Sequence, residues 1–69
     1  MKGKLLVLLP DNEGHEYVEC WINEKRIQGY FYAQENIEDD SINVFFDNQT
    51  VTMKRSGDLL AYLADNFPD

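Results

Sequence analysis

INVFFDNQTVTMK, residues 42–54, contains the clearest structural pattern of the chain. Apolar side chains alternate with other residues from Ile42 to Phe46, and a period of two is typical of a β-strand with one buried face. Asp47-Asn48-Gln49 has the composition of a tight turn. Threonine and valine dominate residues 50–54, as in a strand on a half-buried pleated surface. These residues therefore predict a β-hairpin.

The N-terminal part of the chain predicts another strand. Leu5 to Leu9 is a continuous apolar run, and we expect such a strand to be covered on both faces. The run is too short for the apolar core of a signal peptide and far too short to span a membrane. Residues 10–14, with the sequence PDNEG, are typical of a turn.

The alternating residues 16–23 and 26–33 predict a hairpin between them. A helix over residues 15–26 is the alternative, because several of its apolar side chains also repeat at helical spacing. Gly29 and the β-favouring residues 30–32 support the hairpin.

The C-terminal residues predict one helix. Ser56 is a suitable N-cap, and a stripe at helical spacing follows, formed by Leu59, Leu60, Leu63 and Phe67. Pro68 ends the helix. The expected fold is a single α+β domain over residues 1–69, a small, mostly antiparallel β-sheet of about five strands with one C-terminal helix packed on one face.

Composition limits the partners. Six Lys and Arg stand against 13 Asp and Glu, a formal charge of −7. A surface this acidic repels phosphate backbones and anionic lipid, so we expect no direct nucleic acid and no membrane as partner. Cys20 is the only cysteine, which excludes a disulfide within the chain. Together with the absence of a signal peptide pattern, this favours the cytoplasm.

One helix covers one face of the sheet, so the other face is a candidate binding surface. We expect an inner set of Val18, Cys20, Ile22, Ile27, Phe31 and Ala33 to turn toward the helix. The opposite face then carries the candidate partner-binding residues Tyr17, Trp21, Arg26, Tyr30 and Tyr32, together with Glu19 and Gln28. Tyr, Trp and Arg are enriched where interfaces gain most of their binding energy. The alternative is that these aromatic side chains only stiffen the sheet.

A second candidate surface is the polar segment 34–40, which we expect to be a loop. It carries four carboxylates that could dock a basic partner: Glu35, Glu38, Asp39 and Asp40. The alternative is a solvated loop without a ligand. The segment lacks the glycine of a calcium-binding loop, so no metal site is expected.

No residue pattern predicts catalysis. His15 and Cys20 fall on opposite faces of one strand, and a structural cysteine is the simpler interpretation. The chain has no glycine-rich phosphate loop, no G-x-S-x-G and no H-E-x-x-H. We expect neither enzymatic activity nor a cofactor.

These patterns favour a small acidic protein-binding module, an adaptor or inhibitor of a kind that phages and mobile elements also encode. It would act through the aromatic face, the acidic loop or both. Two alternatives stay open. One is a structural homodimer whose aromatic face is covered by its twin. The other is an acidic nucleic-acid mimic that occupies the basic groove of a nucleic-acid-binding protein.

Overall fold

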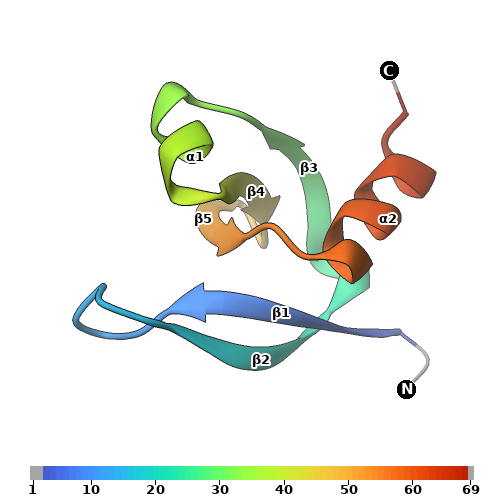
Figure 1. The fold of residues 1–69 in the computed structure, drawn as a ribbon. Coiled ribbons are helices and arrows are strands. Elements are labelled where there is room, and N and C mark those ends of the chain that lie inside the picture. Colours follow the sequence, from blue (N-terminus) through green and yellow to red (C-terminus); the bar gives the residue numbers. More distant parts are fainter. Residues whose placement is uncertain (1–2, 69) are drawn as a thin grey trace.

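The computed structural model describes residues 3–68, which form five strands and two α-helices (Figure 1). The strands are β1 (Lys4–Pro10), β2 (Tyr17–Asn23), β3 (Ile27–Phe31), β4 (Ser41–Phe46) and β5 (Gln49–Lys54). The helices are α1 (Gln34–Asp39) and α2 (Gly57–Asn66), and a 3-10 turn, η1 (Glu24–Arg26), joins β2 to β3. The expected α+β class, with five mostly antiparallel strands and a C-terminal helix, is confirmed.

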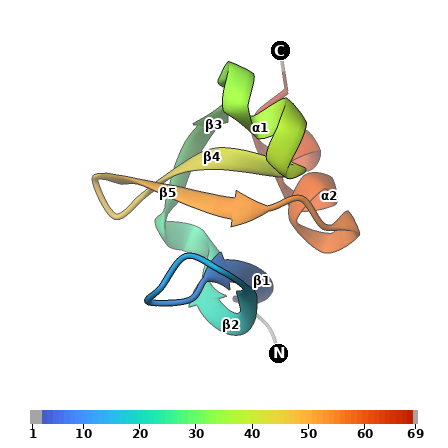
Figure 2. The ribbon, with the colours of Figure 1, turned by 60° about the vertical axis from the view of Figure 1, so that its left-hand side comes forward.

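The strands form two antiparallel sheets rather than one. β1 pairs with β2, and the other sheet has the order β3-β4-β5. The predicted hairpin of residues 16–33 is therefore wrong in its pairing, although both of its strands exist. The side chain of Asn23 accepts a hydrogen bond of 3.0 Å from the Lys25 N–H, and the turn η1 leads the chain from one sheet to the other (Figure 2). The predicted β4–β5 hairpin is confirmed.

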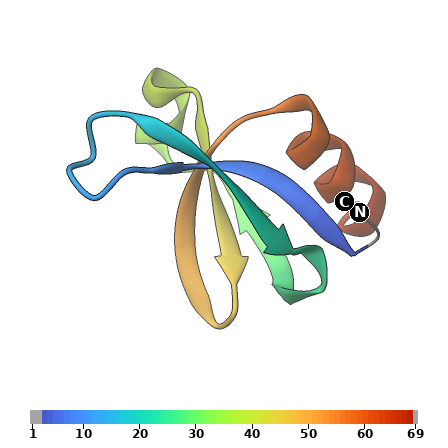
Figure 3. The same cartoon turned by 90° about the horizontal axis from the view of Figure 1, so that it is seen from below.

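The core lies between the two sheets and α2. Its buried apolar side chains come from all three: Leu5, Val7, Ile27, Ile42, Val44, Met53, Leu59 and Leu63. The β1–β2 hairpin crosses the three-stranded sheet (Figure 3), and the other elements lie on one side of it (Figure 1). β1 is therefore covered on one face only, contrary to expectation, and Leu6 and Leu8 remain half-buried on the outer face.

A β-bulge reverses the faces expected for the second half of β3. Ile27 pairs with Phe46 and Gly29 with Phe45, so Gln28 is an extra residue in the ladder. Beyond the bulge, Tyr30 packs against the core, whereas Phe31 is 38% exposed. The sequence pattern predicted the opposite for both residues.

The bulge is held by contacts that the alternating pattern does not reveal. The side-chain amide of Gln28 donates to Asn48 Oδ1 at 3.0 Å, and its oxygen accepts the Asn48 N–H at 2.8 Å. On the outer face, the rings of Phe31 and Phe45 lie 5.1 Å apart. These contacts keep the exposed aromatic pair in place on the three-stranded sheet.

Residues 34–39 form the helix α1 where the sequence predicted a loop. Asn36 is 1% exposed, and its side chain accepts the Ala33 N–H at 2.7 Å and donates to Ser41 Oγ at 2.8 Å. Asp40 ends the helix in the left-handed conformation, with φ 54°. The Arg55 N–H donates to the Asp40 carbonyl at 2.9 Å. These contacts with β4 and with the residue after β5 stabilise a helix too short to form alone.

α2 forms as predicted. The Ser56 hydroxyl accepts the Leu59 N–H at 3.4 Å, and Leu59 and Leu63 are buried. Leu60 is 36% exposed, so it lies outside the buried stripe to which the spacing assigned it. Within residues 3–68, none of the helices is long and apolar enough to cross a membrane.

Candidate functional site

The aromatic residues predicted to share one sheet face lie on separate parts of the molecule. Trp21 is 56% exposed on β2, in the two-stranded sheet. Tyr32 is 51% exposed just after β3. Tyr30 faces the core, and its ring meets that of Tyr32 edge-on at 6.2 Å. A continuous aromatic surface therefore does not form, because the two strands belong to different sheets.

The two remaining candidates of that face contact charged groups of this chain. The Tyr17 ring lies 5.7 Å from Lys54 Nζ, a cation–π contact between β2 and β5. Arg26 Nη1 lies 3.2 Å from Asp47 Oδ2 at the end of β4. Arg26 is thereby engaged close to the β4–β5 turn, whereas Tyr17 lies at the opposite end of β2.

The acidic candidates gather on and next to α1. Glu35, Glu38 and Asp39 are exposed, and Asp40 follows the helix. Arg55 Nε lies 3.2 Å from Asp40 Oδ1. The two atoms form an ion pair by distance but lack the alignment of a hydrogen bond. Among residues 3–68, the other three carboxylates have no ion-pair partner within 4.0 Å.

Arg55 connects this acidic segment to the nearby aromatic side chain. Its guanidinium group lies 5.8 Å from the Tyr32 ring, and Nη2 donates to the Asn36 carbonyl at 3.2 Å. The Arg55 side chain is only 29% exposed, so it acts mainly in holding α1 to the rest of the fold.

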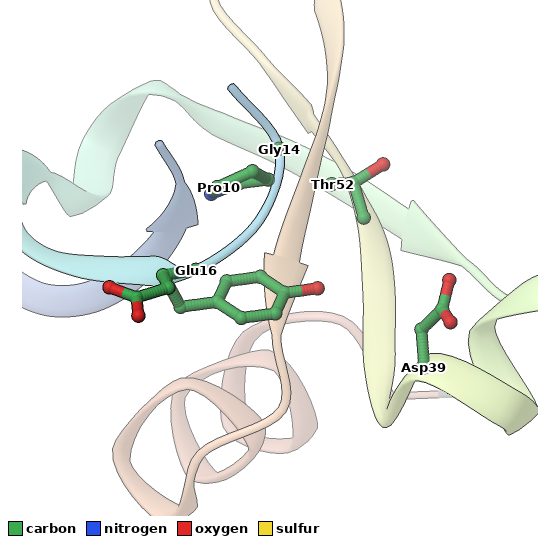
Figure 4. A pocket seen from close by; sticks show the side chains of 6 residues that line it. Pro10, Gly14, Glu16, Asp39 and Thr52 are labelled. Carbon is green, nitrogen blue, oxygen red and sulfur yellow. The ribbon is translucent and has the colours of Figure 1, made fainter. Parts of the chain in front are cut away.

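A cleft of about 400 Å³ brings two of the predicted residues together. It is lined by Pro10, Gly14, Glu16, Tyr17, Asp39 and Thr52. Figure 4 shows Glu16 and Asp39 at opposite ends of this cleft, with the Glu16 carboxylate directed away from Asp39. The turn between β1 and β2 and the helix α1 lie at the same end of the molecule (Figure 1). A second hollow of about 270 Å³ lies on α1 itself, lined by Gln34, Glu35 and Glu38.

Charge at this end of the molecule is mostly negative. The turn adds Asp11, Glu13 and Glu16 to the carboxylates of α1. Asp11 is fixed by its own turn, because Oδ1 accepts the N–H groups of Glu13 and His15, both at 3.0 Å. We name the cleft together with the exposed carboxylates of α1 the acidic cleft. Its geometry suits a basic segment, whose cationic groups would gain from the carboxylates at either end.

Sequence patterns did not single out Glu16 or Thr52. Each is an ordinary residue of a turn or a strand, far along the chain from α1. The only signal was the negative charge of residues 11–16, which becomes informative once the fold places this turn beside α1.

The remaining reactive residues are Cys20, which does not line the cleft, and His15, which lies between the cleft-lining residues Gly14 and Glu16. Cys20 is half-buried against the core, and His15 is exposed beside Glu13, with Nδ1 and Oε2 3.6 Å apart. Residues 3–68 contain no group of three or more side chains placed to hold a metal ion.

Comparison with protein-family models, with curated proteins and with solved structures finds no match for this chain. Its function is therefore inferred from the acidic cleft and from the exposed side chains alone.

Proposed function

We propose that the protein is a small binding module, an adaptor or inhibitor, that holds a Lys- or Arg-bearing segment of a protein partner in the acidic cleft. The observation that carries this proposal is that Glu16 and Asp39, from segments distant in sequence, line the same cleft. A segment with two basic side chains can bond to Glu16 with one and to Asp39 with the other, and such charge-assisted bonds are the stronger kind.

Tyr17 adds a second contribution to the same site. Its ring lies 5.7 Å from the ammonium group of Lys54, and a cationic group of the partner would share or replace this cation–π contact. The exposed Glu35 and Glu38 extend the negative surface along α1, where further basic residues of the partner would bind. The net charge of −7 would also steer a basic partner toward the protein.

The proposal is for binding without catalysis. Glu16 and Asp39 are exposed, whereas a carboxylate that acts as a general acid is usually desolvated by burial. One kind of partner that fits is a nucleic-acid-binding protein whose basic groove takes carboxylates in place of phosphates. We place the function in the cytoplasm, because the lone Cys20 suits a reducing compartment.

A fluorescent oligolysine peptide is the probe that tests the acidic cleft. Its anisotropy is titrated with the wild type and with the double variant Glu16→Gln/Asp39→Asn. The matched control, Asp58→Asn/Asp65→Asn, removes the same charge from exposed positions on α2. A hydrogen bond to a charged group contributes about 1.5–3 kcal/mol, so the cleft variant should weaken binding at least about tenfold.

The control variant should change the affinity much less, and the wild-type affinity should fall as salt is added because exposed charges are screened. Equal weakening by both double variants would show attraction by net charge alone and would overturn the assignment of the cleft. Absence of measurable binding at low salt would overturn the proposed function itself.

A further inference from the structure

The outer edge of β2 is a strand edge with unpaired backbone groups. In the β1–β2 hairpin, the Asp11 N–H donates to the Glu16 carbonyl at 2.7 Å, and the Glu24 N–H to that of Gly3 at 3.2 Å. Both pairs continue the register of the ladder between the two strands. Hydrogen-bonded pairs alternate with non-hydrogen-bonded ones in an antiparallel ladder. The alternation therefore directs the backbone groups of Tyr17, Glu19, Trp21 and Asn23 away from β1.

This edge is open in the described part of the chain. β2 pairs with β1 alone, on its other side. Figures 1 and 2 place β2 on the side of β1 that faces away from the three-stranded sheet. Val18 and Trp21 are 45% and 56% exposed, and Glu19 is the only charged residue of the strand. A seven-residue edge with so little charge is a template for pairing with another strand.

We propose that a second copy of this chain binds this edge, with the two β2 strands antiparallel and the twofold axis at Cys20. In this register, Glu19 pairs with Trp21 of the second copy, and Tyr17 pairs with its Asn23. All the residues whose backbone groups point to the edge then form hydrogen-bonded pairs, and the two hairpins become one continuous four-stranded sheet.

Neighbouring registers are less favourable for two reasons. If the two β2 strands are shifted along each other in either direction, some of the backbone groups that point to the edge lie beyond the end of the other strand and have no partner. The register centred on Glu19 would also place two carboxylates directly opposite each other within the strand, which is destabilising. The register centred on Cys20 leaves the nearest pair of carboxylates, Glu16 and Glu24, beyond the ends of β2. It also places the Trp21 indole beside the Glu19 carboxylate of the second copy, so that the indole N–H has an acceptor.

Burial and charge also favour a second copy of this chain as the occupant. On the inner face, the exposed Val18 would meet Ile22 of the second copy. The two ends of the hairpin differ in charge: the turn carries Asp11, Glu13 and Glu16, and the other end carries Lys4 and Lys25 against the one carboxylate of Glu24. Antiparallel pairing places the acidic end of each copy beside the basic end of the other, and this complementarity would favour a twofold arrangement.

Disulfide crosslinking tests the register directly. Residues opposite each other in a non-hydrogen-bonded pair have Cα atoms about 4.5 Å apart, within the range of roughly 4.4–6.8 Å that a disulfide needs. Mild oxidation should therefore crosslink the wild type through Cys20. In a Cys20→Ser background, Val18→Cys and Ile22→Cys chains should crosslink when mixed and remain uncrosslinked when each is oxidised alone.

Solution mass tests the dimer without any cysteine chemistry. Light scattering at physiological ionic strength, where repulsion between the two acidic copies is screened, should show twice the 8.1 kDa of one chain. Glu19→Pro removes an N–H that points to the edge, away from β1, and should give a monomer. Glu19→Ala keeps that N–H and should remain a dimer, while circular dichroism checks that both variants fold.

A monomeric wild type at all concentrations would overturn the proposal. A dimer that persists in Glu19→Pro would show that another surface is used, and crosslinking of Val18→Cys chains with themselves would refute the register. The cleft variant Glu16→Gln/Asp39→Asn keeps the β2 edge and should remain a dimer, so this proposal and the proposed function fail independently.

Discussion

Replacing Asn36 by alanine should destabilise the protein more than any other change of one polar side chain in α1. The Asn36 amide joins Ala33 and Ser41 through bonds of 2.7 and 2.8 Å, and its Nδ2 is 3.4 Å from Asn43 Oδ1. Each of the two short bonds contributes about 0.5–1.5 kcal/mol, and each buried polar group left without a partner adds about 1–3 kcal/mol. Ser41 is fully buried. The free energy of unfolding should therefore fall by about 2–4 kcal/mol.

That loss is large for a chain of this size. At roughly 0.05–0.15 kcal/mol per residue, a domain of 69 residues has a total stability of about 3–10 kcal/mol. Urea unfolding followed by far-ultraviolet circular dichroism measures the difference between variant and wild type. The control is Asn66→Ala, which removes one exposed bond of 2.9 Å to the Tyr62 carbonyl and should cost less than about 1 kcal/mol.

Equal losses for the two variants would refute the view that Asn36 fixes α1 on the sheet. A second measurement follows from the position of Asp39, which α1 carries into the acidic cleft. If Asn36→Ala releases the helix, the affinity for oligolysine should fall along with the stability.

Two further predictions concern α2. Leu59→Ala should lower the free energy of unfolding by about 2–5 kcal/mol because a fully buried side chain leaves a cavity, whereas urea unfolding of Leu60→Ala, on the exposed side, should show a much smaller loss. Burial, and then the charge of Glu24, raise the pKa of Tyr62 above 10.0. The folded state thus holds this proton more tightly than the unfolded chain, and the resulting stability is present below pH 10 and lost as the pH rises through the folded pKa. Tyr62→Phe removes the 2.9 Å hydrogen bond to the Glu24 carbonyl and should lower the free energy of unfolding by about 1 kcal/mol. Because phenylalanine has no proton to lose, the free energy of unfolding measured in urea should decline less at high pH in this variant than in the wild type.

The local parts of the fold could be predicted because their causes lie within a few residues. The β4–β5 hairpin follows from alternation on both sides of Asp47-Asn48, whose positive φ values of 54° and 66° suit a tight turn. α2 follows from the Ser56 cap and the spacing of Leu59 and Leu63. Leu60 shows the limit of this reasoning. Helical spacing predicts the direction of the apolar face of α2, but the elements packed against the helix decide how wide the buried part of that face is.

Contacts between distant residues decided what the sequence pattern predicted wrongly. Tyr30 and Phe31 exchange faces because Gln28 bulges out of the β3 ladder and bonds to Asn48, across the sheet. α1 is held to the rest of the fold by Arg55, 19 residues along the chain from Asn36, whose Nη2 donates to the Asn36 carbonyl at 3.2 Å. Neither partner can be recognised from the residues on each side of the segment concerned.

By itself, the sequence determined the α+β class, the second hairpin, the C-terminal helix and the acidic character of the surface, since these depend on side-chain periodicity, capping and composition. Only the tertiary structure decided which strands pair, which aromatic side chains remain exposed, and that Glu16 lines the same cleft as Asp39. The physical reason is that a strand satisfies its backbone hydrogen bonds equally well with several partners. The choice among them falls to the joint burial of the whole core, which no single segment encodes.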